Sequence, residues 1–324
     1  MSVEQIRVKV KRCWAETPDI RALDLQAYEG SKLPPWQAGD HIDVMLPAGD
    51  LRQYSLYNHP HDTEIYRIAV KKEPLSRGGS VYLHLINEGD VLTISPPRNN
   101  FPLIVDGAPQ VLMAGGIGIT PIFAMAQQLA AIKADFELHY FAKSPSDAAF
   151  FKQITESPLR ERAVFHFGGD PVETEGRLAD ALAGRAAGTH LYFCGPTPFM
   201  QLISRLTAAN QWPSENLHWE YFSPPVEEAG TTDERPRPFM LCLASTQQEF
   251  LVPADKSALE VLRENGVSVE YSCQQGTCGS CIVKVLEGIP EHHDHFLSEF
   301  HRKSGKKVAL CISRAQSDRL VIDL

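Results

Sequence analysis

Four cysteines near the C-terminal end are the residues of this sequence best suited to chemistry. Three of them lie in the stretch YSCQQGTCGSC at 271–281, and the fourth lies further on in ALCIS. The spacing is C-x4-C-x2-C followed by one distant cysteine, which is typical of plant-type [2Fe–2S] sites. The loop is rich in glycine and other small residues, as expected where backbone N–H groups must approach inorganic sulfide. The candidate cluster ligands are Cys273, Cys278, Cys281 and Cys311.

A disulfide framework and a zinc site are the alternatives for these thiols. Disulfides need an oxidising compartment, and the N-terminal stretch MSVEQIRVKVKRCW lacks the apolar segment of a signal peptide. The odd total of seven cysteines also argues against complete pairing. Structural zinc sites usually combine two close cysteine pairs, or a cysteine pair with a histidine pair, so the spacing favours the cluster. The other three cysteines, Cys13, Cys194 and Cys242, are expected to be small buried residues.

The overall composition sets limits on the class of protein. A chain of 324 residues with 43% hydrophobic and 22% charged residues suggests two or three globular domains. Its net charge of −9 argues against nucleic acid as a partner. No apolar run approaches the length of a membrane-spanning helix, so we expect a cytoplasmic protein without a membrane partner. We interpret the basic run at 301–307 as a solvated turn, and EHHDH at 291–295 as a polar surface loop.

The elements that must position the cysteines follow a much longer series of strands and helices. The first hundred residues alternate apolar and polar positions in short runs, which predicts an antiparallel β-barrel or sandwich. From about residue 108, strand-like and helical runs alternate, which predicts a parallel sheet with crossover helices. The stretch SPPVEEAGTTDERPRP at 223–238 has the composition of a solvated linker. The predicted division is 1–106, 107–224, a linker over 225–237, and 238–324.

Two glycine turns in the second domain are expected at one edge of its sheet. LMAGGIGITP at 112–121 runs from a strand into a helix, and YFCGPTPFM at 192–200 follows a later strand. Glycine lets the backbone approach a phosphate, and the N-terminal end of a helix favours an anion. The first turn lacks the third glycine of the dinucleotide fingerprint, so a purely structural turn remains the alternative.

The first domain offers a second candidate phosphate site. RQYSL at 52–56 combines the cation Arg52 with Tyr54 and Ser55, and alternate residues of a strand face opposite sides. SRGGSVYLHLI at 76–86 then gives a glycine turn that enters a helix. Taken alone, RQYSL is also compatible with an ordinary strand that carries a surface arginine.

Taken together, these motifs resemble the phthalate dioxygenase reductase family, which includes vanillate O-demethylase reductases. RQYSL, RGGS, PRNNFPL, AGGIGITP, FCGP and the cysteine pattern occur in the family's order, and the resemblance covers essentially the whole chain. It implies an FMN-binding antiparallel β-barrel, an NADH-binding α/β domain with a parallel sheet, and a plant-type ferredoxin domain of the β-grasp, α+β type.

The resemblance also implies roles for individual residues. The residues assigned to the FMN phosphate and its surroundings are Arg52, Ala69, Lys71, Arg77, Gly78, Gly79 and Ser80. The residues assigned to the isoalloxazine are Tyr54 and Ser55, with Phe222 in the segment that returns to cover the flavin. The residues assigned to NADH are Gly116, Gly118 and Thr120 at the pyrophosphate, and Cys194, Gly195 and Pro196 at the nicotinamide. The residues expected to act at the reacting atoms are Ser55, Cys194 and Glu220.

The resulting hypothesis is the reductase component of a two-component aromatic-ring oxygenase or O-demethylase. NADH gives up a hydride, whereas a Rieske or mononuclear iron centre accepts one electron at a time, and a flavin converts between the two. The sequence has neither a Rieske pattern nor a mononuclear iron motif, so oxygen chemistry is expected on a partner oxygenase. NADH is preferred because AKSPSDAAF, with Lys143 and Asp147, has no arginine cluster for a 2′-phosphate. A stand-alone NADH:acceptor diaphorase and a zinc-bearing interaction protein are the competing hypotheses.

Overall fold

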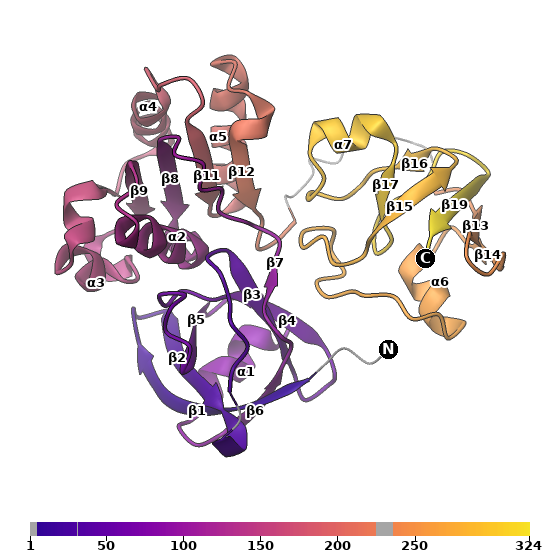
Figure 1. Ribbon diagram of the computed structural model, residues 1–324, viewed down its shortest axis with the longest axis horizontal. Coiled ribbons are helices and arrows are strands. Elements are labelled where there is room, and N and C mark those ends of the chain that lie inside the picture. The colour runs from indigo at the N-terminus through magenta and orange to yellow at the C-terminus, as the bar shows by residue number, and fades with distance from the viewer. Residues whose placement is uncertain (1–4, 31, 225–235) are drawn as a thin grey trace. The chain divides into compact units, whose positions relative to one another are not determined.

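The computed structural model describes residues 5–30, 32–224 and 236–324, which form two compact units (Figure 1). The first unit ends at Phe222 and the second begins at Ser223. Most of the predicted linker, residues 225–235, lies outside the described residues. Each unit is therefore described separately.

The first part of the first unit is the predicted antiparallel barrel. Its strands follow the order β4-β3-β6-β1-β2-β5, with β7 paired to β3, and the edge strands β4 and β5 pack against each other. The short helix α1 (Gly79–Leu85) lies between β5 and β6, and a 3-10 turn, η1 (Tyr28–Gly30), follows β2. The strands are β1 (Ile6–Ala15), β2 (Ile20–Ala27), β3 (Asp40–Met45), β4 (Leu51–Ser55), β5 (Ile65–Lys71), β6 (Val91–Ile94) and β7 (Arg98–Asn99).

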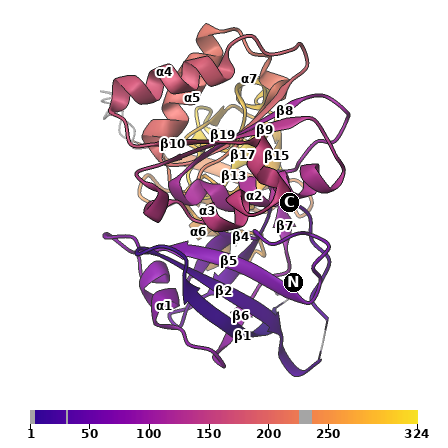
Figure 2. The same ribbon diagram turned by 90° about the vertical axis from the view of Figure 1, so that its left-hand side faces the viewer.

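The second part of this unit is the predicted parallel sheet. Its strand order is β10-β9-β8-β11-β12, and every neighbouring pair is parallel. Helices α2 and α3 cover one face, and α4 and α5 cover the other (Figure 2). The strands are β8 (Gln110–Gly115), β9 (Phe136–Ala142), β10 (Ala163–Phe167), β11 (His190–Cys194) and β12 (Leu217–Glu220). The helices are α2 (Ile119–Ala131), α3 (Phe151–Thr155), α4 (Pro171–Leu182) and α5 (Thr197–Ala209), with 3-10 turns η2 (Gly116–Gly118), η3 (Pro145–Asp147), η4 (Pro158–Arg162) and η5 (Ser214–Asn216).

Residues along β8 explain why helices cover both faces of the sheet. All six residues of the strand are buried, and successive side chains point to opposite faces. Leu112 and Ala114 belong to the core that contains α2, whereas Val111 and Met113 belong to the core beneath α4 and α5. The α2 core is continuous with the interior of the barrel, so the barrel and the sheet share one hydrophobic core.

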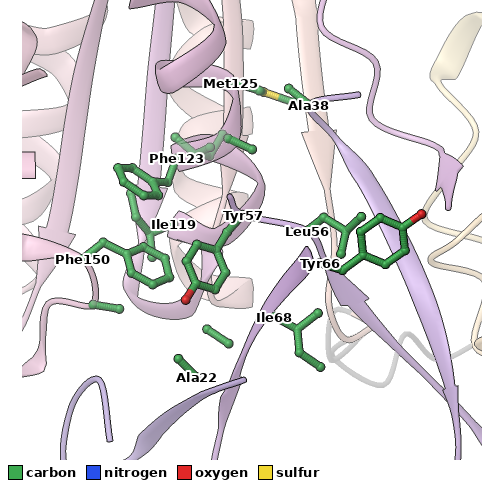
Figure 3. Packing of buried hydrophobic residues seen from close by; sticks show 14 of the residues in the cluster. Ala22, Ala38, Leu56, Tyr57, Tyr66, Ile68, Ile119, Phe123, Met125 and Phe150 are labelled. Carbon is green, nitrogen blue, oxygen red and sulfur yellow. The ribbon is translucent and has the colours of Figure 1, made fainter. Parts of the chain in front are cut away.

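An aromatic stack lies where the barrel meets α2 and α3 (Figure 3). The rings of Tyr57 and Phe150 are stacked with centroids 4.3 Å apart, and Phe150 and Phe123 are stacked at 5.0 Å. Helix α3 begins at Phe151, and the residue before it, Phe150, adopts a left-handed conformation with φ 62°.

The second unit has the predicted β-grasp arrangement. Its main sheet has the order β14-β13-β19-β15-β17, in which β13 and β19 are parallel, and a small ladder joins β16 to β18. The strands are β13 (Phe239–Leu243), β14 (Glu249–Val252), β15 (Ile282–Glu287), β16 (Pro290–Glu291), β17 (Lys307–Ala309), β18 (Arg314–Ala315) and β19 (Arg319–Asp323). The helices are α6 (Ala258–Glu264) and α7 (Glu299–Ser304).

Local sequence explains both helices of this unit. Ser257 and Glu260 form a reciprocal capping box at the start of α6. Ser298 caps α7 by accepting the N–H of His301, and Gly305 ends that helix in a left-handed conformation. The basic run at 301–307 is thus partly helical, and our interpretation of it as a simple turn was wrong.

Candidate functional site

The two glycine turns of the parallel sheet lie against each other. Strands β8 and β11 are neighbours. The chain continues from β8 toward one edge of the sheet and from β11 toward the other, so the carboxyl ends of these two strands form a topological switch point. Open α/β folds bind ligands at such a point. A Cβ atom on Gly118 would lie 2.2 Å from the carbonyl oxygen of Cys194, and one on Gly115 would lie 3.0 Å from Pro196. The sequence predicted this shared edge, but not that both glycines are required by contact between the loops.

The predicted pyrophosphate residues have distinct surroundings. Gly116 has a positive φ of 52°, and a Cβ there would meet no atom within 4 Å, so its backbone faces open space. Thr120 is buried and its hydroxyl donates to the carbonyl of Ile117 at 3.1 Å, which closes the first turn of α2. Gly116 therefore offers an approach for a ligand, whereas Gly118 and Thr120 shape the turn.

In the barrel, Arg52 lies directly beneath the turn that begins α1. Its Nη2 donates to the carbonyl of Arg77 at 2.8 Å, and a Cβ on Gly79 would lie 2.6 Å from its Cγ. Burial raises the pKa of Tyr54 to about 12, and the nearby guanidinium groups of Arg52 and Arg77 act in the opposite direction. This site therefore combines two cations with a glycine, Gly79, that has no room for a side chain. Such an arrangement fits a flavin phosphate.

The other residues assigned to this cofactor lie around the same turn. Ser80 is buried, accepts the N–H of Glu73 at 3.1 Å and donates to Ser76 at 2.9 Å. Ala69 and Lys71 are on β5, and Ala69 is packed into the barrel core. Alternation along the strand places Ala69 and Lys71 on one side of it. Gly78, at φ 94°, directly precedes α1 in a conformation that favours glycine.

Three residues expected at the reacting atoms come together where β4, β11 and β12 end. Ser55 Oγ donates to Glu220 Oε2 at 3.4 Å, although the two residues lie in different domains of the sequence. Cys194 is fully buried and is paired with Glu220 in the register of β11 and β12. This cluster therefore links the flavin strand of the barrel to the second glycine turn of the sheet.

The electrostatics of this cluster are unusual. Desolvation raises the pKa of Glu220 to about 8, against the opposing effect of the hydrogen bond from Ser55. Burial and the neighbouring Glu220 carboxylate also raise the pKa of Cys194 well above its usual range. A carboxyl group that is mainly protonated at neutral pH thus lies beside a protonated thiol, and a perturbed group in such a position is a candidate functional residue.

Three further residues that the sequence analysis named are Phe222, Asp147 and Lys143. Phe222 ends the first unit and is 40% exposed, so an aromatic surface is available to cover a bound ring. Asp147 is in η3 after β9 and accepts a hydrogen bond from Ser144 at 2.6 Å. Lys143 is exposed at the end of the same strand.

In the second unit, the four predicted ligands form two pairs of thiols. Cys278 donates to Cys273, which lowers the pKa of Cys273 to about 5 and raises that of Cys278. Cys311 donates to Cys281 in the same way, so the pKa of Cys281 is lowered and that of Cys311 is raised. In the part of the chain that the structure describes, no three His, Cys, Asp or Glu side chains are arranged to hold a single metal ion. Two adjacent thiol pairs fit a two-iron cluster with two protein ligands on each iron.

The backbone of the cysteine loop is directed at these thiols. The N–H groups of Gln275 and Thr277 donate to Cys273, and that of Gly276 donates to Cys311. Gly276 and Gly279 have φ of 71° and 75°, and a Cβ on Gly279 would lie 2.6 Å from the ring of Phe296. The small residues of the loop therefore bring N–H groups to the sulfur atoms of Cys273 and Cys311.

The interpretation of the segment at 291–295 as a polar surface loop holds only in part, since the side chains of Glu291 and His293 are 42% and 39% exposed but Asp294 is not. Asp294 is fully buried, and its carboxylate accepts the N–H of Leu297 at 2.8 Å and the hydroxyl of Ser313 at 3.3 Å. The N–H of His295 donates to the carbonyl of Gly276, so the segment packs on the cysteine loop. The sequence missed Asp294 as a support of that loop, because the polar composition of EHHDH gave no indication that one of its residues is buried.

The remaining cysteines correspond in part to expectation. Cys194 and Cys242 are buried, but Cys13 is only half-buried and lies 2.9 Å from Arg21 Nη2. In the described residues, no helix is both long and apolar enough to cross a membrane.

Comparison with known proteins gives consistent matches over the chain. Residues 243–316 match the family described as the 2Fe-2S iron-sulfur cluster binding domain. The vanillate O-demethylase oxidoreductase of Pseudomonas putida is 45% identical over 312 residues, which are 95% of this chain and 96% of that protein. A solved structure of phthalate dioxygenase reductase is similar with a TM-score of 0.71 and 36% identity, and the match covers 99% of this chain and 98% of the other. A crystal structure of an intact type IV self-sufficient cytochrome P450 monooxygenase gives a TM-score of 0.86 and 35% identity, and the chain spans 41% of its length.

Proposed function

The chain belongs to the phthalate dioxygenase reductase family, and from this premise we propose that it takes a hydride from NADH onto FMN and passes single electrons through a [2Fe–2S] cluster to a terminal oxygenase. When bound, the flavin accepts electrons as a pair and returns them singly, and the cluster carries one at a time. One NADH thus supplies two one-electron deliveries, with release of NAD⁺ and a proton.

The observation that carries this proposal is the contact between Ser55 and Glu220. It joins the strand with the phosphate-binding arginine to the sheet edge with the two glycine turns. A flavin held by Arg52 and the Arg77–Ser80 turn would present its ring to Tyr54 and Ser55. A dinucleotide on the turns at Gly116 and Gly195 would present its nicotinamide beside Cys194. The two rings would therefore meet at this contact, with Phe222 available to cover them.

Three side chains at this contact would favour hydride transfer between the two rings. Glu220 is mainly neutral at pH 7, so it adds no negative charge beside the ring that accepts the hydride. Ser55 supplies a hydroxyl at the same place, and the buried thiol of Cys194 limits access of water. Both reactants are thus oriented within one compact unit.

The remaining assignments follow the same premise. The flavin is FMN, because the cations beneath the α1 turn suit a single terminal phosphate. The domain limits are 1–106, 107–224 and 238–324, with the linker between them. The partner is an oxygenase of the kind named for the vanillate relative, which acts by O-demethylation, and the protein acts in the cytoplasm.

Analysis of the purified protein tests this function. We expect one FMN and two irons with two sulfides per chain, and visible absorption from both groups. Under anaerobic conditions NADH should bleach the flavin and then reduce the cluster, and a purified vanillate-type oxygenase should accept the electrons with saturable kinetics. Zinc in place of iron, or no reduction by NADH, would contradict the proposal.

A further inference from the structure

Phe150 has the backbone conformation most in need of support within the first unit. Its φ of 62° and ψ of 13° are left-handed, although the side chain is large and fully buried. Bulky residues rarely adopt this conformation, and they keep it only where neighbouring groups hold it in place. The groups that hold Phe150 therefore form a specific contact between the barrel and the parallel-sheet part of this unit.

Glu16 of the barrel holds the backbone of Phe150. Its Oε1 accepts the N–H of Phe150 at 2.9 Å, and its Oε2 accepts the indole N–H of Trp14 at 2.8 Å. Glu16 lies in the turn between β1 and β2, where its own N–H donates to the carbonyl of Ile20 at 2.8 Å. The carboxylate is thus fixed on the barrel and binds the residue that directly precedes α3, a helix that covers the parallel sheet.

The side chain of Phe150 contacts residues close to the candidate site on both the barrel and α2. It stacks between Tyr57 of the barrel and Phe123 of α2 (Figure 3). Tyr57 follows Ser55 by two residues, and Phe123 follows Thr120 by three, in the helix that begins at the first glycine turn. Gln127 of α2 adds a hydrogen bond of 2.8 Å to the carbonyl of Tyr57.

The stack borders an open cavity. A cavity of about 450 Å³ lies beside the stack, and Trp14, Tyr57 and Phe123 are among its lining residues. The stack and the polar contact of Glu16 therefore join the barrel to the sheet beside a region that side chains do not fill.

We propose that Glu16 is a positioning residue for hydride transfer. By holding the N–H of Phe150, it locks the aromatic stack and so sets the separation between the flavin strand and the nicotinamide turn. This inference rests on the proposed function, since it concerns the same reaction. A displacement of about 1 Å between reacting groups can lower a rate about 100-fold, so a loosened stack should affect the rate more than the binding of NADH.

The test compares Glu16→Ala, which removes both acceptors, with Glu16→Gln, which keeps one. In the apoprotein, hydrogen exchange at the Phe150 amide should become faster in Glu16→Ala. In the loaded protein, the rate constant of flavin reduction should fall about 10-fold or more, with the NADH dissociation constant within about twofold of wild type. The exchange rate and the flavin reduction rate of Glu16→Gln should lie between those of wild type and Glu16→Ala. If Glu16→Ala fails to fold, the same two measurements on Glu16→Gln test the proposal.

Two variants serve as controls. Trp14→Phe removes the other partner of Glu16 but leaves its contact with Phe150, and Glu156→Gln alters an exposed carboxylate just after α3. Both should reduce flavin at the wild-type rate. Unchanged exchange at Phe150 would overturn the inference, and so would faster exchange with an unchanged rate of flavin reduction. Failure of wild-type flavin to accept electrons from NADH would instead contradict the proposed function.

Discussion

At the scale of single residues, Arg52 and Glu220 carry the clearest consequences. The first is a cation placed beneath a glycine turn, and the second is a carboxyl group whose pKa is raised to about 8 by desolvation. Each therefore predicts a change that a single substitution should produce.

Arg52→Ala should weaken flavin binding and leave the cluster intact. Losing a charge-assisted contact to a phosphate removes roughly 1.5–3 kcal/mol of binding free energy, which is about a tenfold to hundredfold loss of affinity. The variant should purify with little flavin and full iron–sulfur absorption, and added FMN should restore NADH oxidation. Arg52→Lys should recover only part of the affinity, because an ammonium group cannot form the planar fork.

Lys9→Ala, which removes an exposed cation of the same barrel, is the matched control. Stoichiometric flavin in Arg52→Ala after dialysis would contradict the phosphate assignment, as would release of FAD from the wild-type protein.

Glu220 should make flavin reduction depend on pH. The pKa of its carboxyl is raised from 4.5 to about 8, so the group is neutral below about pH 8 and charged above it. An ionised carboxylate beside the flavin opposes the negative charge that arrives with the hydride, so the rate constant should fall as pH rises through about 8. Glu220→Gln, measured by anaerobic stopped-flow, should remove this step, whereas Glu215→Gln should retain it. If the decrease in rate near pH 8 persists in Glu220→Gln, another group must be responsible for it.

At the scale of elements, the sequence predicted the type of most strands and helices, and the four cysteines remain its proposal for the cluster ligands. Alternating and helical periods follow from which side of an element is buried, so β8, α2 and α5 could be recognised from local pattern. The contact between Ser55 and Glu220 could not be predicted from local pattern, because it depends on how the barrel packs on the sheet. The burial of Asp294 and the left-handed Phe150 likewise depend on distant partners that a local pattern does not contain.

The cysteine loop yields a prediction at this scale, because one of its glycines has no space for a side chain. Gly279 and Gly266 have φ of 75° and 73°, but a Cβ on Gly279 would lie 2.6 Å from the Phe296 ring, whereas one on Gly266 would meet nothing within 4 Å. Gly279→Ala should therefore lower the iron content and speed loss of the cluster. Gly266→Ala should show only the backbone strain of about 1–2 kcal/mol in unfolding free energy, with normal iron content.

Iron and sulfide analysis with thermal melting separates the two effects. The double variant Gly279→Ala/Phe296→Ala should regain part of the cluster, because the smaller side chain removes the clash. Equal cluster content in Gly279→Ala and Gly266→Ala would show that Phe296 does not constrain the loop.

At the scale of the whole molecule, the chemistry is divided between the two compact units. The groups assigned to FMN and NADH lie in the unit that ends at Phe222, and the four thiols lie in the unit that begins at Ser223. Hydride transfer should therefore not need the cluster, whereas single-electron delivery should.

The most direct test of this account is anaerobic mixing of NADH with Cys278→Ser, followed by flavin absorbance and by the electron paramagnetic resonance signal of the reduced cluster. Cys242→Ser, which changes a buried cysteine outside the loop, is the control and should behave as wild type. We expect Cys278→Ser to bleach its flavin at close to the wild-type rate, with no cluster signal and no reduction of the oxygenase. Loss of flavin bleaching in this variant, or normal electron delivery without the cluster, would contradict the central claim.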